Sequence, residues 1–125
     1  MIAKLLLVAL GGACGASLRF LSVSAFMRVT GEVAWGTLFV NVAGSFLMGL
    51  AVVVLTARFP DAAPRALPFL TAGVLGGFTT FSAFSLDAVR LIEDGRLAWA
   101  GAYILGSVML SVLALVAGMA VGRAV

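Results

Sequence analysis

Three of the few polar side chains in this sequence recur every four residues inside a long apolar stretch. They are Thr37, Asn41 and Ser45, and their spacing places them on one face of a helix. The amide group of Asn41 offers two N–H donors, which suit a small anion. The alternative role of a lone asparagine in an apolar segment is a hydrogen bond to a neighbouring helix. This face therefore has the chemistry either of an anion path or of helix packing.

A second polar track lies near the end of the sequence, where Tyr103, Ser107 and Ser111 again recur every four residues. Hydroxyl groups along one helix face could replace part of the hydration shell of an anion. Serine hydroxyls also commonly bond back to carbonyl groups of their own helix. The spacing alone does not distinguish these two roles.

The apolar stretch between these two tracks carries glycine and threonine where an ordinary membrane helix would carry leucine, isoleucine or valine. Gly76, Gly77, Thr79 and Thr80 fall near its centre and predict a helix that is broken at the membrane midplane. Broken membrane helices occur where the freed backbone groups line a cavity or bind an ion, and carbonyl oxygens suit a cation such as sodium. The alternative is an unbroken helix with a glycine-rich packing face.

Two phenylalanines follow directly, and their spacing gives them one helix face. Phe81 and Phe84 are three residues apart. An aromatic ring has a positive edge and a negative face, so ring edges could attract a small anion in a dry passage. Simple packing would explain the same pair equally well.

These residues belong to a chain that is 63% hydrophobic and only 10% charged, whereas soluble domains carry roughly 25% charged residues. Four apolar segments reach the ~20 residues that a helix needs to cross a hydrocarbon core. We expect one four-helix transmembrane domain that runs up and down, with spans at about residues 3–27, 33–57, 66–90 and 97–122. The sequence therefore predicts an all-α, multi-pass protein of the cell membrane.

The first span is the least regular of the four, because it includes Arg19. Lys4, the apolar run after it and the small residues before Cys14 also imitate a cleaved lipoprotein-type signal. The apolar character continues beyond Cys14, so we favour a membrane span. A single cysteine excludes an intrachain disulfide and says nothing about the redox compartment.

Basic residues are divided almost evenly between the two predicted ends of the bundle. The two sets are Lys4, Arg58, Arg65 and Arg123 at one end, and Arg28, Arg90 and Arg96 at the other. The Lys/Arg excess that orients membrane proteins is thus close to zero, and closer still if Arg19 lies near the second boundary. A chain without a preferred orientation could insert both ways and pair as an antiparallel, dual-topology homodimer.

Glycines spaced four residues apart favour close approach between membrane helices. The pairs are Gly11 with Gly15, Gly73 with Gly77, and Gly118 with Gly122. Four helices of this length enclose little space, so we expect a pore to require more than one subunit. The glycine pairs could serve that assembly, or they could pack helices within one subunit.

Other function classes find little support in the sequence. The basic residues are scattered singly rather than gathered in a patch, which argues against nucleic-acid binding. Histidine is absent, no nucleophile has a candidate base, and the acidic residues fall in predicted loops or at span ends. These acidic residues are Glu32, Asp61, Asp87, Glu93 and Asp94. We therefore expect no enzyme activity.

Three sequence blocks carry a resemblance to a known family. They are Gly11-Gly12 with Gly15-Ala16 and Arg19; Gly36-Thr37-Leu38 with Asn41, Gly44, Ser45 and Phe46; and the run from Gly76-Gly77-Phe78 through Thr79-Thr80-Phe81-Ser82-Ala83-Phe84-Ser85. The blocks resemble the signatures of the Fluc (CrcB) fluoride channels, and the resemblance covers the whole chain. The third block is the most specific of the three.

The resemblance implies an antiparallel homodimer with two fluoride pathways and a structural, non-transported sodium ion at the centre of the interface. The backbone carbonyls that hold sodium in the family correspond to Gly76 and Thr79. The pathway residues of the family correspond to Asn41, Phe81, Phe84, Tyr103 and Ser111, and its first-helix arginine corresponds to Arg19. We add Thr37 of the polar face to this pathway. The implied function is passive, fluoride-selective export that lowers cytoplasmic fluoride, with membrane lipid and a second copy as partners.

Three positions depart from the pattern of that family. Ala83 stands where threonine is usual, Trp35 where proline is frequent, and Asp87 where glutamate is common. We expect conduction to survive these changes, with an altered rate. The main competing hypotheses are a proton-coupled multidrug exporter, which needs a carboxylate deep in a span, and a membrane scaffold without transport.

Overall fold

The structure is a computed structural model of residues 1–125, and all its regular elements are helical. The elements are α1 (Ile2–Thr30), α2 (Val33–Arg58), α3 (Ala63–Leu67), η1 (Pro68–Leu75), α4 (Gly76–Phe78), α5 (Phe81–Glu93) and α6 (Leu97–Ala124). Four segments are long and apolar enough to cross a membrane, because α3, η1, α4 and α5 together form the third. The prediction of four apolar membrane helices is confirmed.

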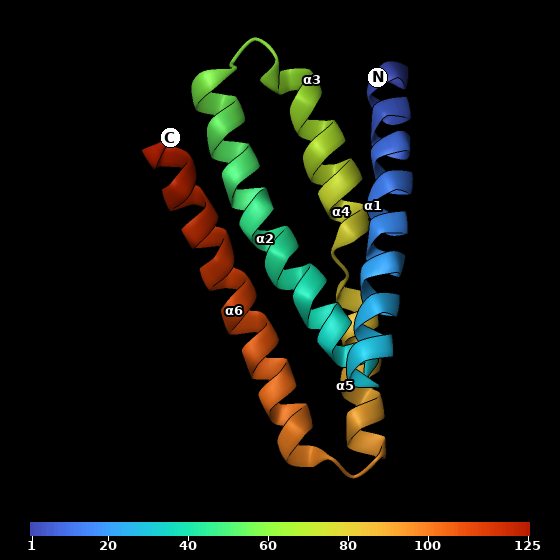
Figure 1. The fold of residues 1–125 in the computed structure, drawn as a ribbon. Helices are drawn as coiled ribbons and strands as arrows, with labels where there is room; N and C mark the ends of the chain where they lie inside the picture. Colours follow the sequence, from blue (N-terminus) through green and yellow to red (C-terminus); the bar gives the residue numbers. More distant parts are fainter.

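The third segment is not one regular helix. Its first part contains the π-helix η1 of eight residues, which runs into the short α4. The backbone then becomes extended at Thr79 (φ −86°, ψ 159°) and Thr80 (φ −156°, ψ 121°) before α5 begins. A helix broken within the third span was predicted, and the structure confirms it (Figure 1).

The break lies at the two threonines, whereas the sequence interpretation began it at the two glycines. Gly76 and Gly77 remain helical, and Gly77 instead allows close packing. A Cβ atom on Gly77 would lie 2.7 Å from the carbonyl oxygen of Gly12 in α1. The alternative of an unbroken helix is therefore wrong, although the glycines beside the break do form a packing face.

Glycines also account for the other close helix contacts. A Cβ atom on Gly11 would lie 2.6 Å from the carbonyl oxygen of Phe69, so α1 and the third segment touch backbone to backbone. On the other side of the bundle, Cβ atoms on Gly49 and Gly118 would meet backbone atoms of α6 and α2 respectively. The predicted glycine pairs therefore pack helices within one subunit.

Both chain termini and the connection between α2 and α3 lie at one end of the molecule, which is the upper end in Figure 1. The turns between α1 and α2 and between α5 and α6 lie at the lower end. Each of these lower turns contains a glycine with a positive φ angle, 77° at Gly31 and 76° at Gly95. Glycine adopts this left-handed conformation without the steric cost that a Cβ atom imposes.

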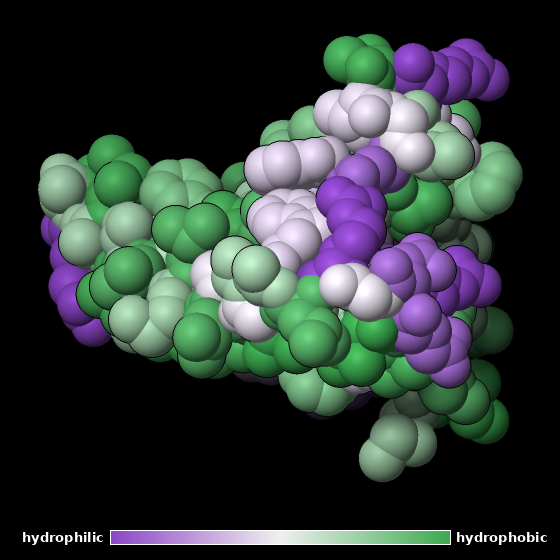
Figure 2. All heavy atoms as spheres, turned by 90° about the horizontal axis from the view of Figure 1, so that it is seen from below, coloured by the Kyte–Doolittle hydropathy of each residue, from purple (hydrophilic) through white to green (hydrophobic).

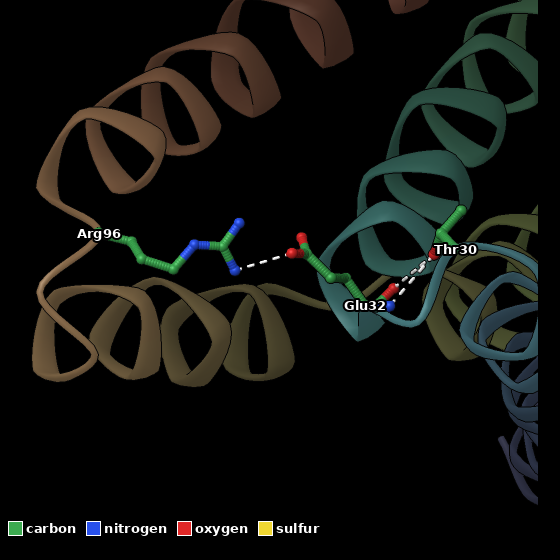
Figure 3. A network of polar contacts seen from close by, with 3 residues as sticks. All are labelled: Thr30, Glu32 and Arg96. Carbon is green, nitrogen blue, oxygen red and sulfur yellow. Dashed lines mark hydrogen bonds and ion pairs between the residues drawn. The ribbon is translucent and has the colours of Figure 1, made fainter.

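The lower turns are joined by an ion pair. The guanidinium group of Arg96 lies 2.7 Å from the carboxylate of Glu32, and Thr30 holds the α1–α2 turn by hydrogen bonds to Glu32 (Figure 3). Exposed pairs of this kind contribute about 0–1 kcal/mol. Seen from this end, hydrophilic residues form a band with residues of intermediate hydropathy on one side and hydrophobic residues on the other (Figure 2).

Candidate functional site

A side chain from α2 stabilises the extended backbone at the helix break. The amide Nδ2 of Asn41 donates to the carbonyl oxygen of Thr80 at 3.0 Å, and its Oδ1 accepts from the Thr80 N–H at 2.7 Å. An extended residue inside a membrane needs such partners, because no water is present to satisfy its backbone groups. Asn41 therefore bonds to a neighbouring segment, and the second N–H of its amide stays available to a ligand.

The other side of the break is tied to α1. Arg19 is partly buried and donates from Nε to the carbonyl oxygen of Gly77 at 3.0 Å. Its two terminal nitrogens make no hydrogen bond or ion pair within the chain. Asn41 and Arg19 thus position the backbone on either side of Thr79 and leave donor groups unused.

A cavity of about 290 Å³ opens beside the break. Its lining combines the amide, hydroxyl and aromatic groups singled out from the sequence with two valines. The lining residues are Asn41, Ser45, Thr79, Thr80, Phe81, Phe84, Ser107, Val108, Ser111 and Val112. Residues from α2, from the broken segment and from α6 therefore meet in one place, although they are far apart in the sequence.

Ser107 is the residue of this cavity whose buried side chain lacks a hydrogen-bond partner. It is only 5% exposed, and its hydroxyl oxygen has no hydrogen-bond partner. A buried hydroxyl without a partner costs free energy unless something binds it. The sequence interpretation placed Ser107 on the polar track of the last helix but chose only its neighbours Tyr103 and Ser111 as pathway residues. The four-residue spacing was the available signal for Ser107.

The two phenylalanines lie together, as their spacing predicts. The ring centroids of Phe81 and Phe84 are 5.4 Å apart, with the planes tilted by 55°. Phe84 is buried and continues the aromatic contact to Tyr103, whose ring lies 5.3 Å away. Phe81 is 77% exposed and projects from the subunit surface. One wall of the site is therefore uncovered in a single chain.

A second cavity of about 330 Å³ lies on the α1 side of the break. It contains Ala83 together with Arg19 and Thr37, two of the three predicted pathway residues that do not line the first cavity. The third, Tyr103, lines neither cavity and instead packs on Phe84. Thr80 lines both cavities. The two spaces therefore adjoin at the extended residue of the break.

Tyr103 and Asp87 form a buried polar pair next to this site. The Tyr103 hydroxyl donates to Oδ2 of Asp87 at 3.1 Å, and both residues are almost fully buried. The expectation that every acidic residue lies in a loop or at a span end is wrong for Asp87. The prediction places Asp87 near the end of the third span, but α5 continues to Glu93, so Asp87 lies inside this helix and is buried.

The positions implied for sodium have properties that suit a cation. The carbonyl oxygen of Thr79 lies in the extended linker and accepts no hydrogen bond from the chain, and Gly76 is exposed on the subunit surface. Hard cations bind oxygen ligands, including backbone carbonyls. No group of three or more His, Cys, Asp or Glu residues is placed to hold a metal ion. A cation at Gly76 and Thr79 would therefore be held by backbone carbonyl oxygens.

This fold and these cavities define a class of protein: a multi-pass membrane protein with polar and aromatic cavities beside a broken helix. The family model described as "CrcB-like protein, Camphor Resistance (CrcB)" matches residues 6–119. The chain belongs to this CrcB family, and the resemblance read from the three sequence blocks is confirmed. This family, together with the names of the relatives given next, makes the chain an ion channel of the cell membrane and not an enzyme.

Relatives cover nearly the whole chain. The "Fluoride-specific ion channel FluC" of Cereibacter sphaeroides is 56% identical over 124 residues, which are 98% of this chain and 97% of the relative. The proteins of the same name from Agrobacterium fabrum and Rhizobium meliloti are 52% and 50% identical. The former match covers 94% of both chains, and the latter covers 96% of both.

Proposed function

We propose that this protein conducts fluoride passively across the cell membrane and so lowers cytoplasmic fluoride. The observation that carries the proposal is the pair of cavities that adjoin at Thr80. Between them they contain the free guanidinium nitrogens of Arg19, a free N–H of Asn41 and the unpaired hydroxyl of Ser107. These are donors that can replace part of an anion's hydration shell. The names of the relatives support fluoride as the anion.

The direction of flow follows from the chemistry of the weak acid HF. Neutral HF crosses the membrane and releases fluoride in the cytoplasm, and the channel lets the anion leave down its gradient. The proton-coupled exporter is the competing hypothesis, and buried Asp87 is its only candidate carboxylate. That carboxylate accepts a hydrogen bond from Tyr103, and the family is one of channels.

Fluoride efflux from proteoliposomes tests the proposal. We expect fluoride-selective efflux that is unchanged when a pH gradient is imposed, with little chloride efflux. Efflux that depends on the proton gradient would support the exporter. A folded protein that releases no fluoride would support the scaffold instead.

We propose further that two antiparallel copies complete the pathway around a central sodium ion. The uncovered ring of Phe81 and the exposed position of Gly76 support a second copy at this face. The near-even division of basic residues supports insertion in both orientations. A reporter fused to the C-terminus should be found on both sides of the membrane, and its restriction to one side would contradict dual topology. A sodium-sized density on the two-fold axis tests the ion.

Replacing Phe81 or Phe84 by isoleucine is expected to reduce fluoride efflux while the protein remains folded. Isoleucine keeps apolar volume but removes the positive ring edge that an anion can approach. The measurement is the efflux rate at equal amounts of reconstituted protein. Phe39, which packs on Phe26 away from the cavities, provides the matched control as Phe39→Ile. Unchanged efflux in both cavity variants would contradict the role of the rings.

A further inference from the structure

A third hollow of the surface is wholly apolar and shares no residue with the two cavities at the break. This groove has a volume of about 610 Å³, and all ten of its lining residues are hydrophobic. It runs along α2 from Leu47 to Leu55, between Leu70 and Leu75 of η1 on one side and the end of α6 on the other. Nothing in the proposed ion pathway uses it.

The length of the groove matches one leaflet of a membrane. Leu47 and Leu55 are eight residues apart, so they are separated by about 12 Å at 1.5 Å per residue. Half of the hydrocarbon core of a bilayer is about 15 Å thick. The groove ends near Leu55, three residues before the C-terminus of α2. This end of α2 lies at the upper end of the molecule in Figure 1. A single acyl chain lying parallel to α2 would fit this length.

A basic residue lies where the groove reaches the surface. Arg58 follows Val54, a groove residue, by four positions and therefore lies on the same face of α2. Arg58 is exposed and belongs to no ion pair, since the pair of Arg96 with Glu32 is the salt bridge of this chain. An anionic group at the end of the groove would give Arg58 a partner.

The net charge of the two ends of the molecule also favours an anionic partner for Arg58. The upper end carries Lys4, Arg58, Arg65 and Arg123 against the single acidic side chain of Asp61. At the lower end Arg28, Arg90 and Arg96 are balanced by Glu32, Glu93 and Asp94. The upper end is thus cationic and the lower end is nearly neutral. The cationic end is the one at which the groove opens.

We infer that the groove binds an acyl chain of an anionic phospholipid, with the headgroup held at Arg58. A second copy of the chain is a poorer occupant on grounds of charge. A parallel copy would bring another cationic end to this surface, and an antiparallel copy would bring the nearly neutral end. Only the lipid supplies negative charge together with a chain of the right length.

Binding of phosphatidylglycerol and of phosphatidylcholine to the purified protein in detergent, counted by native mass spectrometry, tests the inference. The wild type is expected to retain phosphatidylglycerol in preference to phosphatidylcholine. Arg58→Gln should weaken phosphatidylglycerol binding about fivefold, which is the effect of one basic residue at an anionic membrane surface. Arg90→Gln, an exposed arginine at the other end, is the matched control and should leave binding unchanged.

A second variant tests the groove itself. Ala51→Phe places a ring in the groove and should reduce retention of both lipids, whereas Arg58→Gln affects only the anionic one. Equal loss in the Arg58 and Arg90 variants would overturn the inference, because it would indicate non-specific attraction. An Ala51→Phe protein that loses its oligomeric state but keeps its bound lipid would assign the groove to a second copy. The measurement involves no ion flux, so its outcome is independent of fluoride conduction.

Discussion

Replacing Asn41 by alanine is expected to lower fluoride efflux by about tenfold or more, with the four helices still formed. The change leaves the N–H and carbonyl groups of Thr80 without partners in the membrane interior. An unpaired buried group costs about 1–3 kcal/mol, and about 1.4 kcal/mol corresponds to a tenfold change in rate. Relaxation of the break would also displace Phe81, the next residue. A fluoride electrode measures the efflux rate, and circular dichroism measures the helix content.

Two further variants test whether the loss is specific to Asn41 and whether it depends on the amide donors. Ser45→Ala removes a polar group from the same cavity wall without touching Thr80, and we expect a smaller loss. Asn41→Asp keeps an acceptor for the Thr80 N–H but removes the amide donors and adds negative charge, so fluoride efflux should fall as far as in Asn41→Ala. Wild-type efflux from Asn41→Ala would refute both roles.

Replacing Gly118 by alanine is expected to destabilise the subunit more than any other single methyl group added to α6. The new Cβ atom would collide with the backbone carbonyl of Phe46 and lie 3.1 Å from the backbone nitrogen of Leu50. Backbone atoms cannot swing aside, so α2 and α6 must separate. Overpacking of this kind costs about 1–3 kcal/mol. Because the neighbours of Gly118 are rigid backbone atoms, we expect its cost to lie in the upper part of this energy range. The midpoint of thermal unfolding in detergent measures the effect.

Gly106 is the matched control on the same helix, because no heavy atom lies within 4 Å of the Cβ position there. Gly106→Ala should retain the unfolding midpoint of the wild type, or exceed it slightly, since alanine favours the helix. Equal unfolding midpoints for the Gly118 and Gly106 variants would show that α2 and α6 can move apart without a loss of stability.

The existence of the break could be predicted from the sequence, but its position could not. Glycine and threonine are both unfavourable in a plain apolar helix, so their occurrence together at the centre of a span indicated an interruption. Which of them breaks the helix depends on what lies opposite. Gly77 faces Gly12 of α1, whereas Thr80 faces the amide of Asn41. These partners are set by tertiary packing, which no local spacing encodes.

The burial of polar residues was harder to infer than their periodicity. The four-residue spacing correctly brought Asn41 and Ser45 together with Ser107 and Ser111 at one cavity, whereas Thr37 lines the second cavity and Tyr103 lines neither. Asp87 is the exception, because it lies near the predicted end of the third span and yet is buried. The hydroxyl of Tyr103, 16 residues away, satisfies its carboxylate and permits burial. This pair can be recognised only once the packing of α5 against α6 is known.

The two-residue break at Thr79 and Thr80 has an electrostatic consequence of its own. It ends one helix and starts another in the interior of the membrane, so α4 presents carbonyl groups and α5 presents N–H groups across a short gap. Helix ends carry partial charges of about −0.5 at the C-terminus and +0.5 at the N-terminus, and little solvent screens them there. A single interruption therefore presents opposite polarities on its two sides, which would suit the sodium ion and the fluoride ion of the proposed function. Any substitution that rejoined the helix would remove both at once.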